Sequence, residues 1–294
     1  MDFNQTIKHY QLFINQELEK YLRKDACPEQ ILNTATEYSL MAGGKRLRPI
    51  LMLQTYNLFA EDTRICIPFA IAMEMIHNFS LIHDDLPGID NDDFRHGKLT
   101  NHKKFNEATA ILAGDSLLNQ AYMVISKCFI EDKTKQEEKV RAFQEFTHGV
   151  DRMIAGEYID TEYEGKEVAE EYLEYVHQNK TGALLTACVR IGAILADAGE
   201  EDIERLTQYA EKIGLTFQIK DDILSEIGDE AILGKPVGND KEKGKCTYVT
   251  KYGLEKAKEV LEKLTKEAVE IAETYGEQGE FLKELAIYIK DRNK

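Results

Sequence analysis

The sequence predicts an all-α protein, and three observations lead to this fold class. Apolar residues recur at spacings of three and four, and no long segment alternates apolar and polar residues as a half-buried strand does. Only five of the 294 residues are proline, and none lies between Pro87 and Pro236. Because proline breaks a helix interior, such a stretch suits consecutive long helices. A chain of this length can bury roughly 75% of its unfolded surface, so we expect one domain over residues 1–294.

The elements follow from local patterns along the chain. The first predicted helix carries a stripe of apolar residues at helical spacing, formed by Tyr10, Ile14, Leu18 and Tyr21. The last long helix carries a second stripe, formed by Ala257, Leu261, Leu264, Ala268 and Ile271. Turns are predicted where glycine, proline and polar residues gather, at residues 42–44, 85–97, 228–244 and 252–253.

An acidic cluster, Asp84-Asp85-Leu86-Pro87-Gly88-Ile89-Asp90, follows an apolar run that predicts a helix. His77, Leu81 and the pair Asp84-Asp85 lie at i, i+4, i+7 and i+8, so they share one helix face. Carboxylates on the end of a buried helix need cations, water or a cavity beside them. The alternative is that the pair is only a solvated helix end.

A second acidic cluster, Asp221-Asp222-Ile223-Leu224-Ser225, repeats this arrangement with Gln218 on the same face. Two such clusters, each able to hold a hard divalent cation through carboxylate oxygens, suit a substrate that carries a diphosphate. A solvated helix end is again the alternative, because the chain has 53 acidic residues.

The charge of the chain narrows the classes of partner. A formal net charge of -16 argues against nucleic acid and against an anionic membrane surface. The basic residues nonetheless gather in three islands, which are Lys45 with Arg46 and Arg48; Arg95, His96, Lys98, His102, Lys103 and Lys104; and Lys235, Lys241, Lys243 and Lys245. Basic islands in a chain with acidic clusters suit a small polyanion, although any one island could be a solvated face.

The cysteines and the N-terminal residues indicate the compartment. The five cysteines are odd in number, widely spaced and without a C-x-x-C pair, which suggests reduced thiols. No basic region followed by an apolar run begins the chain, and no segment approaches 18 uninterrupted apolar residues. We therefore expect a cytoplasmic protein without stable membrane insertion.

A Glu-x-x-His spacing occurs three times, at 74–77, 145–148 and 174–177. Di-iron carboxylate proteins use this spacing in helical bundles. A di-iron bundle is therefore an alternative from another class, although it leaves the acidic clusters and the basic islands unexplained.

The chain closely resembles the trans-prenyltransferases that make isoprenyl diphosphates, particularly bacterial farnesyl diphosphate synthases. The resemblance covers most of the chain and rests on segments in the family's order, at 43–49, 82–87, 98–103, 110–115, 180–184, 217–224 and 233–235. It implies an isoprenoid synthase-type bundle of about ten or more helices around a deep central cavity, with the acidic clusters across its mouth. It also implies a homodimer and an active site with three Mg²⁺ ions when diphosphate is bound.

The resemblance implies a reaction and the residues that carry it. An allylic diphosphate ionises, isopentenyl diphosphate attacks the cation, and a proton is lost. The implied metal ligands are Asp84, Asp85, Asp90, Asp221 and Asp222. Asp84, Asp90 and Asp221 would bridge Mg²⁺ to the allylic diphosphate, and Lys180, Lys235 and Arg95 would add positive charge to it. Thr181 and Gln218 would place oxygen dipoles near the developing cation, and no protein base is implied.

The second substrate is held without ionisation. By resemblance, Gly44, Lys45, Arg48 and His77 bind isopentenyl diphosphate, and His96 stands at a further position for it. Lys245 is a further substrate-binding residue, with no particular substrate assigned. Arg48 can clamp phosphate oxygens bidentately, which Lys45 cannot.

Product length is expected to depend on Phe79 and Ser80, which precede Asp84 by five and four residues. In this family an aromatic residue there, with the insertion that contains Pro87-Gly88, is the farnesyl type, because a bulky tunnel floor stops chain growth. Phe79 could also be an ordinary core residue. The alternatives within the fold are a geranylgeranyl diphosphate synthase, a non-catalytic subunit of a heteromeric prenyltransferase and a class I terpene cyclase.

Four segments depart from the family pattern. Ser225 replaces a third aspartate, His96 replaces an arginine, Ala155-Gly156-Glu157 replaces Gly-Gly-Gln, and Cys246 follows Lys245 where serine is common. None of these changes removes an implied inner-sphere metal ligand.

Overall fold

The computed structural model describes residues 2–23, 27–166, 170–227 and 247–293. Within these ranges the regular structure is helical apart from one two-stranded hairpin, which confirms the predicted all-α class. The chain divides into two compact units, one of residues 1–53 with 62–139 and the other of residues 54–61 with 140–294. The single domain expected from the sequence stays a prediction.

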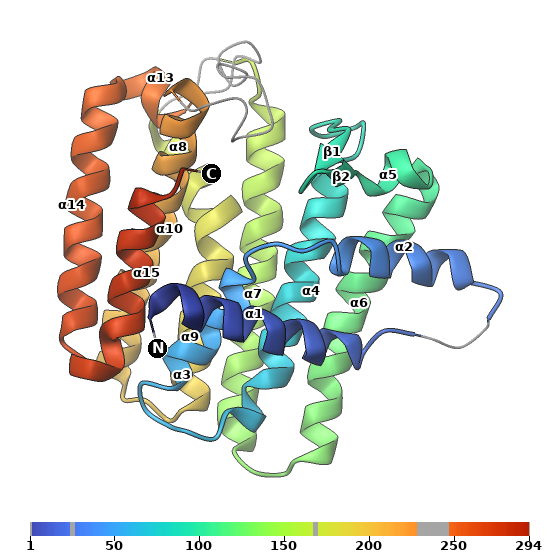
Figure 1. Ribbon diagram of the computed structural model, residues 1–294, viewed down its shortest axis with the longest axis horizontal. Coiled ribbons are helices and arrows are strands. Elements are labelled where there is room, and N and C mark those ends of the chain that lie inside the picture. Colours follow the sequence, from blue (N-terminus) through green and yellow to red (C-terminus); the bar gives the residue numbers. More distant parts are fainter. Residues whose placement is uncertain (1, 24–26, 167–169, 228–246, 294) are drawn as a thin grey trace. The chain divides into compact units, whose positions relative to one another are not determined.

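The first unit is built around two long helices. Its elements are α1 (Phe3–Glu19), α2 (Gln30–Leu40), the start of α3 (Leu47–Tyr56), η1 (Thr63–Ile65), α4 (Ile67–Asp84), β1 (Phe94–Arg95), β2 (Lys98–Leu99), α5 (Asn101–Lys104) and α6 (Glu107–Glu131). Figure 1 shows α4 and α6 lying side by side along most of their length. The hairpin lies just beyond the end of α4, within and next to the turn predicted at residues 85–97.

Helix α4 is the core helix of this unit. It begins with Pro68 in its first turn, where a missing N–H costs nothing, and it buries side chains on nearly every face. Among the helices that the structure describes, the segment Thr63–Asp84 is long and apolar enough to cross a membrane. About two thirds of its apolar window (67%) is buried inside the protein, as in the core helix of a folded domain. Its position at the core places the carboxylates of Asp84 and Asp85 at the end of a rigid element.

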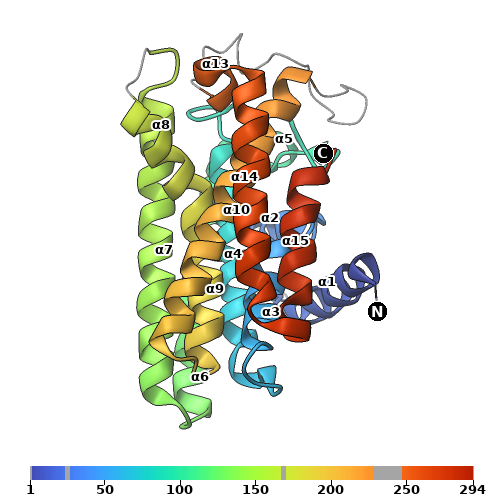
Figure 2. The same cartoon turned by 90° about the vertical axis from the view of Figure 1, so that its left-hand side faces the viewer.

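Among the described residues, the second unit contains the end of α3 and the other helices, of which α7 begins in the last residues of the first unit. They are α7 (Gln136–Glu162), α8 (Glu170–Val176), the π-helix η2 (His177–Gly182), α9 (Ala183–Leu195), α10 (Glu200–Ile227), α13 (Tyr248–Tyr252), α14 (Leu254–Glu273), η3 (Gly276–Gly279) and α15 (Glu280–Asp291). Figure 2 shows α10, α14 and α15 as neighbours. The fully buried Tyr209 of α10 donates a hydrogen bond to the Leu282 carbonyl of α15, with an oxygen–oxygen distance of 2.6 Å.

The predicted apolar stripes lie in the core. Ile14 and Leu18 of α1 are fully buried, and Ala257, Leu261 and Ala268 of α14 are also buried. Part of the α14 stripe packs on the end of α10 that carries the second acidic cluster, in a core group of Ile219, Ile223, Val249, Ala257 and Leu261. The apolar side of α10 is thus fixed by packing, which fixes the direction of its polar side.

Candidate active site

The first acidic cluster is formed where α4 ends and the chain turns back on itself. The Asp90 N–H donates to the carbonyl of Asp84 at 2.9 Å, and the N–H groups of Ile89 and Asn91 donate to the carbonyl of Leu86 at 2.9 and 3.1 Å. This turn brings Asp90 back to Asp84 at the end of the helix. The three predicted metal ligands of this cluster therefore belong to one compact turn.

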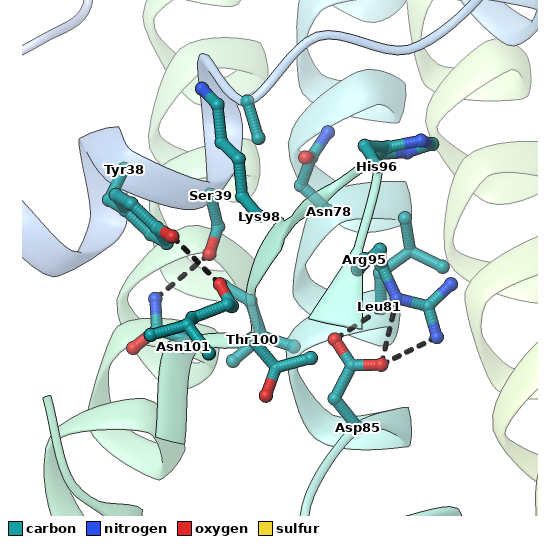
Figure 3. Close-up of a pocket in the computed structure, with 13 residues that line it drawn as sticks. Tyr38, Ser39, Asn78, Leu81, Asp85, Arg95, His96, Lys98, Thr100 and Asn101 are labelled. Carbon is teal, nitrogen blue, oxygen red and sulfur yellow. Dashed lines mark hydrogen bonds and ion pairs between the residues drawn. The ribbon is translucent and has the colours of Figure 1, made fainter. Parts of the chain in front are cut away.

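Arg95 of the hairpin binds the same helix end. Its Nη2 atom lies 2.6 Å from Asp85 Oδ1 and 3.3 Å from Asp84 Oδ2, and its Nε donates to Asp85 at 2.8 Å. Burial raises the pKa of Asp85 to about 6 despite the opposing effect of Arg95. Figure 3 shows the Arg95 side chain directed at the Asp85 carboxylate. The structure thus joins the predicted diphosphate-binding arginine to the predicted metal ligands.

The hairpin that carries Arg95 is anchored on α2. Tyr38 donates to the Leu99 carbonyl at 2.8 Å, and the Asn101 amide donates to Ser39 Oγ at 2.9 Å (Figure 3). Its two-residue turn, His96-Gly97, has φ values of 51° and 75°, as a type I′ hairpin requires. This hairpin was not predicted from the sequence, although Gly97 lies within a predicted turn and indicates one.

Two residues predicted to bind isopentenyl diphosphate are in contact. Arg48 of α3 lies 3.1 Å from His77 of α4, measured from Nη1 to Nε2. Burial, followed by the charges of Arg48 and Arg95, lowers the pKa of His77 well below its ordinary value. His77 is therefore neutral at pH 7 and accepts the hydrogen bond from Arg48.

Gly44 and His96 are also brought together, although they are far apart in the sequence. A Cβ atom placed on Gly44 would lie 3.7 Å from the His96 Nε2 atom, and Gly44 has a φ of 108°. The Gly44 backbone and the His96 ring are therefore neighbours in the first unit. Burial and the charge of Arg95 lower the pKa of His96, so this ring is neutral at pH 7.

The residues predicted to set product length lie one turn before the acidic pair. Phe79 is 7% exposed, and its ring meets the His83 ring edge-on with centroids 4.9 Å apart. Ser80 donates to the His77 carbonyl at 2.9 Å. Phe79 is thus a well-packed interior group, and its role as a tunnel floor stays a prediction.

The second acidic cluster places its two carboxylates in different surroundings. Asp222 is 5% exposed and accepts hydrogen bonds from Gln218 Nε2 at 3.1 Å and from the Tyr248 N–H at 2.7 Å. The side chain of Asp221 is 44% exposed and pairs with Arg292 of the C-terminal segment at 2.7 Å. Asp221 is therefore the more accessible of the two predicted metal ligands.

Thr181 and Gln218 form a hydrogen-bonded chain with Asp222. Thr181 Oγ1 donates to Gln218 Oε1 at 3.0 Å, and the Gln218 amide donates onward to Asp222. Thr181 lies in the π-helix η2, an irregularity that often marks functional sites. The residues that the sequence analysis assigned to the developing cation are thus held in one network.

Lys180 of the same π-helix is held by two carboxylates. Its Nζ lies 2.9 Å from Glu157 Oε2 and 2.7 Å from Asp160 Oδ2. Gly156 has no room for a side chain, because a Cβ there would overlap the Lys180 backbone nitrogen. The Gly156-Glu157 departure from the family pattern therefore keeps the close approach and supplies a partner for Lys180, which sequence reasoning did not foresee.

Some predicted residues lie outside the described part of the chain, namely Lys235, Lys245 and Cys246. Ser225 is buried at 5% exposure on α10.

The donor atoms fit magnesium better than a redox metal. Among the described residues, no three His, Cys, Asp or Glu side chains already converge as a ligand cage. Mg²⁺ is typically bound through one or two carboxylates and completes its shell with water and substrate phosphates, so carboxylates at two helix positions suit it. The glutamates of two Glu-x-x-His segments are instead paired with arginines, Glu74 with Arg46 and Glu145 with Arg190.

Comparison with known proteins shows the class of protein. The polyprenyl synthetase family matches residues 29–284, so the chain belongs to this family. It is 44% identical over 282 residues to the farnesyl diphosphate synthase of Bacillus subtilis (strain 168), covering 95% of each chain. It is 44% identical over 242 residues to the large subunit 1 of a heterodimeric chloroplastic geranylgeranyl pyrophosphate synthase of Arabidopsis thaliana, covering 81% of this chain and 65% of that one.

A solved structure shows the same fold. The apo FPP/GFPP synthase of Zymomonas mobilis superimposes with a TM-score of 0.87 at 32% identity, covering 98% of each chain. The predicted family is thus confirmed, and the di-iron alternative is not supported.

Proposed function

We propose that this protein is a farnesyl diphosphate synthase, which condenses isopentenyl diphosphate with dimethylallyl or geranyl diphosphate. The observation that carries the proposal is the end of α4. There Asp84, Asp85 and Asp90 lie in one compact turn, and Arg95 of the hairpin binds Asp84 and Asp85. The full-length relatives named farnesyl diphosphate synthase support the same function.

The first half of the reaction is charge separation in the allylic diphosphate. Asp84, Asp90 and Asp221 would hold Mg²⁺, which we propose to number three ions per site. The bound metal would stabilise the departing diphosphate as a Lewis acid. Arg95 is fixed against the carboxylates of α4 and supplies positive charge at that site. Lys180, held by Glu157 and Asp160, is oriented as a further cationic group.

The second half concerns the cation and its attacking partner. The Thr181 hydroxyl donates a hydrogen bond to the side-chain carbonyl oxygen of Gln218, which orients the hydroxyl. These oxygen dipoles are therefore fixed before the reaction. Gly44, Lys45, Arg48, His77 and His96 bind isopentenyl diphosphate in this proposal. The neutral His77 leaves the positive charge of Arg48 available to phosphate. The released diphosphate is the base that takes the proton.

Phe79 is the residue that supports a farnesyl product. Its burial one turn before the acidic pair supports a bulky floor that ends growth at fifteen carbons. A geranylgeranyl product is the second candidate, because a geranylgeranyl pyrophosphate synthase subunit is also among the relatives.

We further propose that residues 1–294 act as one catalytic domain in a cytoplasmic homodimer. Large apolar side chains on the outside of α6 support a subunit interface, since Leu112, Met123 and Ile130 are 55%, 51% and 71% exposed and share one side of the helix.

Substitution of Asp84 tests the function. We expect Asp84→Ala to lower condensation on the order of a hundredfold or more, because it removes a carboxylate that acts through the metal. The assay follows incorporation of isopentenyl diphosphate in the presence of Mg²⁺ and geranyl diphosphate. Glu259→Ala, an exposed acid on α14, is the control and keeps wild-type turnover. Turnover within a few fold in Asp84→Ala contradicts the metal-ionisation role.

A further inference from the structure

The loop that precedes α3 has an unusual backbone. Gly43, Gly44 and Arg46 have φ values of 110°, 108° and 53°. Glycine adopts such values freely, whereas a long side chain at positive φ costs free energy and persists only where surrounding contacts hold it. Lys45 lies within this strained stretch and Arg48 two residues beyond it, so the loop sets the placement of both proposed diphosphate ligands.

Arg46 supplies the contacts that hold the loop. Its side chain is 1% exposed, and its guanidinium binds Glu74 Oε1 at 2.6 Å, the Leu40 carbonyl at 2.6 Å and Asn15 Oδ1 at 3.0 Å. These acceptors belong to α4, α2 and α1. The planar guanidinium therefore ties three helices to the loop, which a lysine could not do with the same geometry.

Helix α1 binds the loop at a second point. Gln11 lies one turn before Asn15 on the same face of α1, and its amide donates to the Lys45 carbonyl at 3.1 Å. On α4, Asn78 donates to Glu74 Oε1 at 3.3 Å and to the Glu74 carbonyl at 2.8 Å. The Glu74 carboxylate that holds Arg46 is thus itself held.

The spacing on α4 matches the spacing in the loop. Glu74 and His77, three residues apart on one helix face, bind Arg46 and Arg48 respectively. The Glu-x-x-His segment at 74–77 resembles a metal-binding motif in the sequence, but in the structure it binds two arginines. A shift of Arg46 would therefore displace the Arg48–His77 pair as well.

We propose that Arg46, its partners Asn15 and Glu74, and Gln11, which binds the Lys45 carbonyl, form a clamp that positions the loop for isopentenyl diphosphate. None of these four side chains is assigned to substrate in the proposed function. They are positioning residues, and their substitution changes the Michaelis constant for isopentenyl diphosphate while leaving that for the allylic diphosphate unchanged. This inference rests on the proposed function.

Mild variants on α1 give the cleanest test. We expect Asn15→Ala and the double variant Gln11→Ala with Asn15→Ala to raise KM for isopentenyl diphosphate by about 3-fold and about 10-fold, the larger change corresponding to about 1.4 kcal/mol. KM for geranyl diphosphate and kcat change less than twofold. Both variants keep the buried ion pair intact, so their folding is preserved.

Variants of the ion pair extend the test. Glu74→Gln keeps an acceptor for Arg46 and is expected to raise KM for isopentenyl diphosphate less than Glu74→Ala, which leaves a buried charge unpaired. Glu145→Ala breaks the Arg190 ion pair of the second unit and is the control, with both KM values unchanged. Thermal melts confirm that each variant is folded at the assay temperature.

The outcomes separate the clamp from the proposed function. If the wild-type protein condenses the substrates and the folded variants on α1 keep KM for isopentenyl diphosphate within twofold, the clamp is overturned and the function stands. Equal rises in both KM values also overturn it. Calorimetric binding of isopentenyl diphosphate gives the same readout without turnover, and absence of binding by the wild-type protein overturns both.

Discussion

Asp85 and Asp222, the second residues of the two acidic pairs, are both bonded within the protein. Asp85 is held by Arg95, and Asp222 is held by Gln218 and the Tyr248 N–H. The first residues are paired as well, Asp84 with Arg95 and Asp221 with Arg292, but their side chains are 16% and 44% exposed against 4% for each second residue. The first aspartate of each pair is thus the more accessible of the two, as the proposed metal ligation requires.

Phe79 gives a prediction about product length. Phe79→Ala removes a buried ring one turn before Asp84 and is expected to yield products of twenty carbons or more, because the growing chain gains room. Chromatography of the reaction products measures this. Phe69→Ala is the matched control, since Phe69 is fully buried on the same helix but lies about 22 Å from Asp84 along it. An unchanged fifteen-carbon product in Phe79→Ala removes the tunnel-floor argument.

His177 gives a prediction about pH. Burial lowers its pKa to about 4, against a small opposing effect of Asp160, while the unfolded chain binds a proton near pH 6.5. The free energy of unfolding therefore falls as pH drops from about 6.5 towards 4, because the unfolded state binds more protons there. Between pH 7 and pH 5 this group accounts for about 2 kcal/mol of the loss.

Urea denaturation at the two pH values measures this effect. His177→Gln is expected to lose about 2 kcal/mol less than the wild-type protein between pH 7 and pH 5, whatever its stability at pH 7. An identical pH dependence in His177→Gln and the wild-type protein shows that this histidine does not carry the effect.

The sequence identifies the first basic island, but it does not show which of its residues is buried and which are accessible. The sequence groups Lys45, Arg46 and Arg48 as equivalent cations, whereas the structure buries Arg46 against Glu74. A buried arginine and an exposed one look alike in a sequence, because burial depends on partners from distant helices. The available signal for the burial of Arg46 was Glu74, an acidic residue on an apolar helix, four residues from Asn78 and three from His77.

Among the elements, α10 and the C-terminal segment meet at the second acidic cluster. Arg292 binds Asp221, donates to the Phe217 carbonyl at 2.9 Å and lies 3.9 Å above the Phe217 ring. The Arg292 guanidinium is thus paired with the Asp221 carboxylate, which we propose as a ligand of Mg²⁺. If Asp221 binds Mg²⁺ as proposed, the cation and the arginine compete for it.

Removal of this competition gives a prediction. Arg292→Met keeps an apolar stem over Phe217 but loses the charge, and we expect the Mg²⁺ concentration for half-maximal activity to fall about two- to fivefold. Magnesium titration of the condensation rate measures it. Lys290→Met, which removes a nearby cation paired with Glu262, is the control. An unchanged or higher magnesium requirement in Arg292→Met contradicts the competition.

The elements show which structures a sequence specifies. The long helices were predictable because their apolar periodicity is repeated over many turns, and Ile14, Leu18, Leu261 and Ala268 are buried as expected. The hairpin at 94–99 and the π-helix at 177–182 were not, because each depends on a few hydrogen bonds rather than on a period. Both of these irregular elements carry proposed site residues.

For the whole molecule, the exposed apolar side of α6 gives a prediction about assembly. We expect light scattering to show a dimer of the 33.6 kDa chain. Leu112→Glu combined with Met123→Glu is expected to give a monomer, because charges replace apolar area at the proposed interface. Leu12→Glu changes a similarly exposed leucine of α1 and is the control, with the dimer retained. A monomeric wild-type protein contradicts the proposed assembly.

Product analysis shows whether the whole molecule makes farnesyl diphosphate. The purified protein is incubated with Mg²⁺, isopentenyl diphosphate and either dimethylallyl or geranyl diphosphate, and the products are separated by chain length. We predict farnesyl diphosphate as the end product from both starters, with no condensation after chelation of the metal. A twenty-carbon end product contradicts the farnesyl assignment while keeping the chemistry, and no condensation with either starter contradicts the proposed function itself.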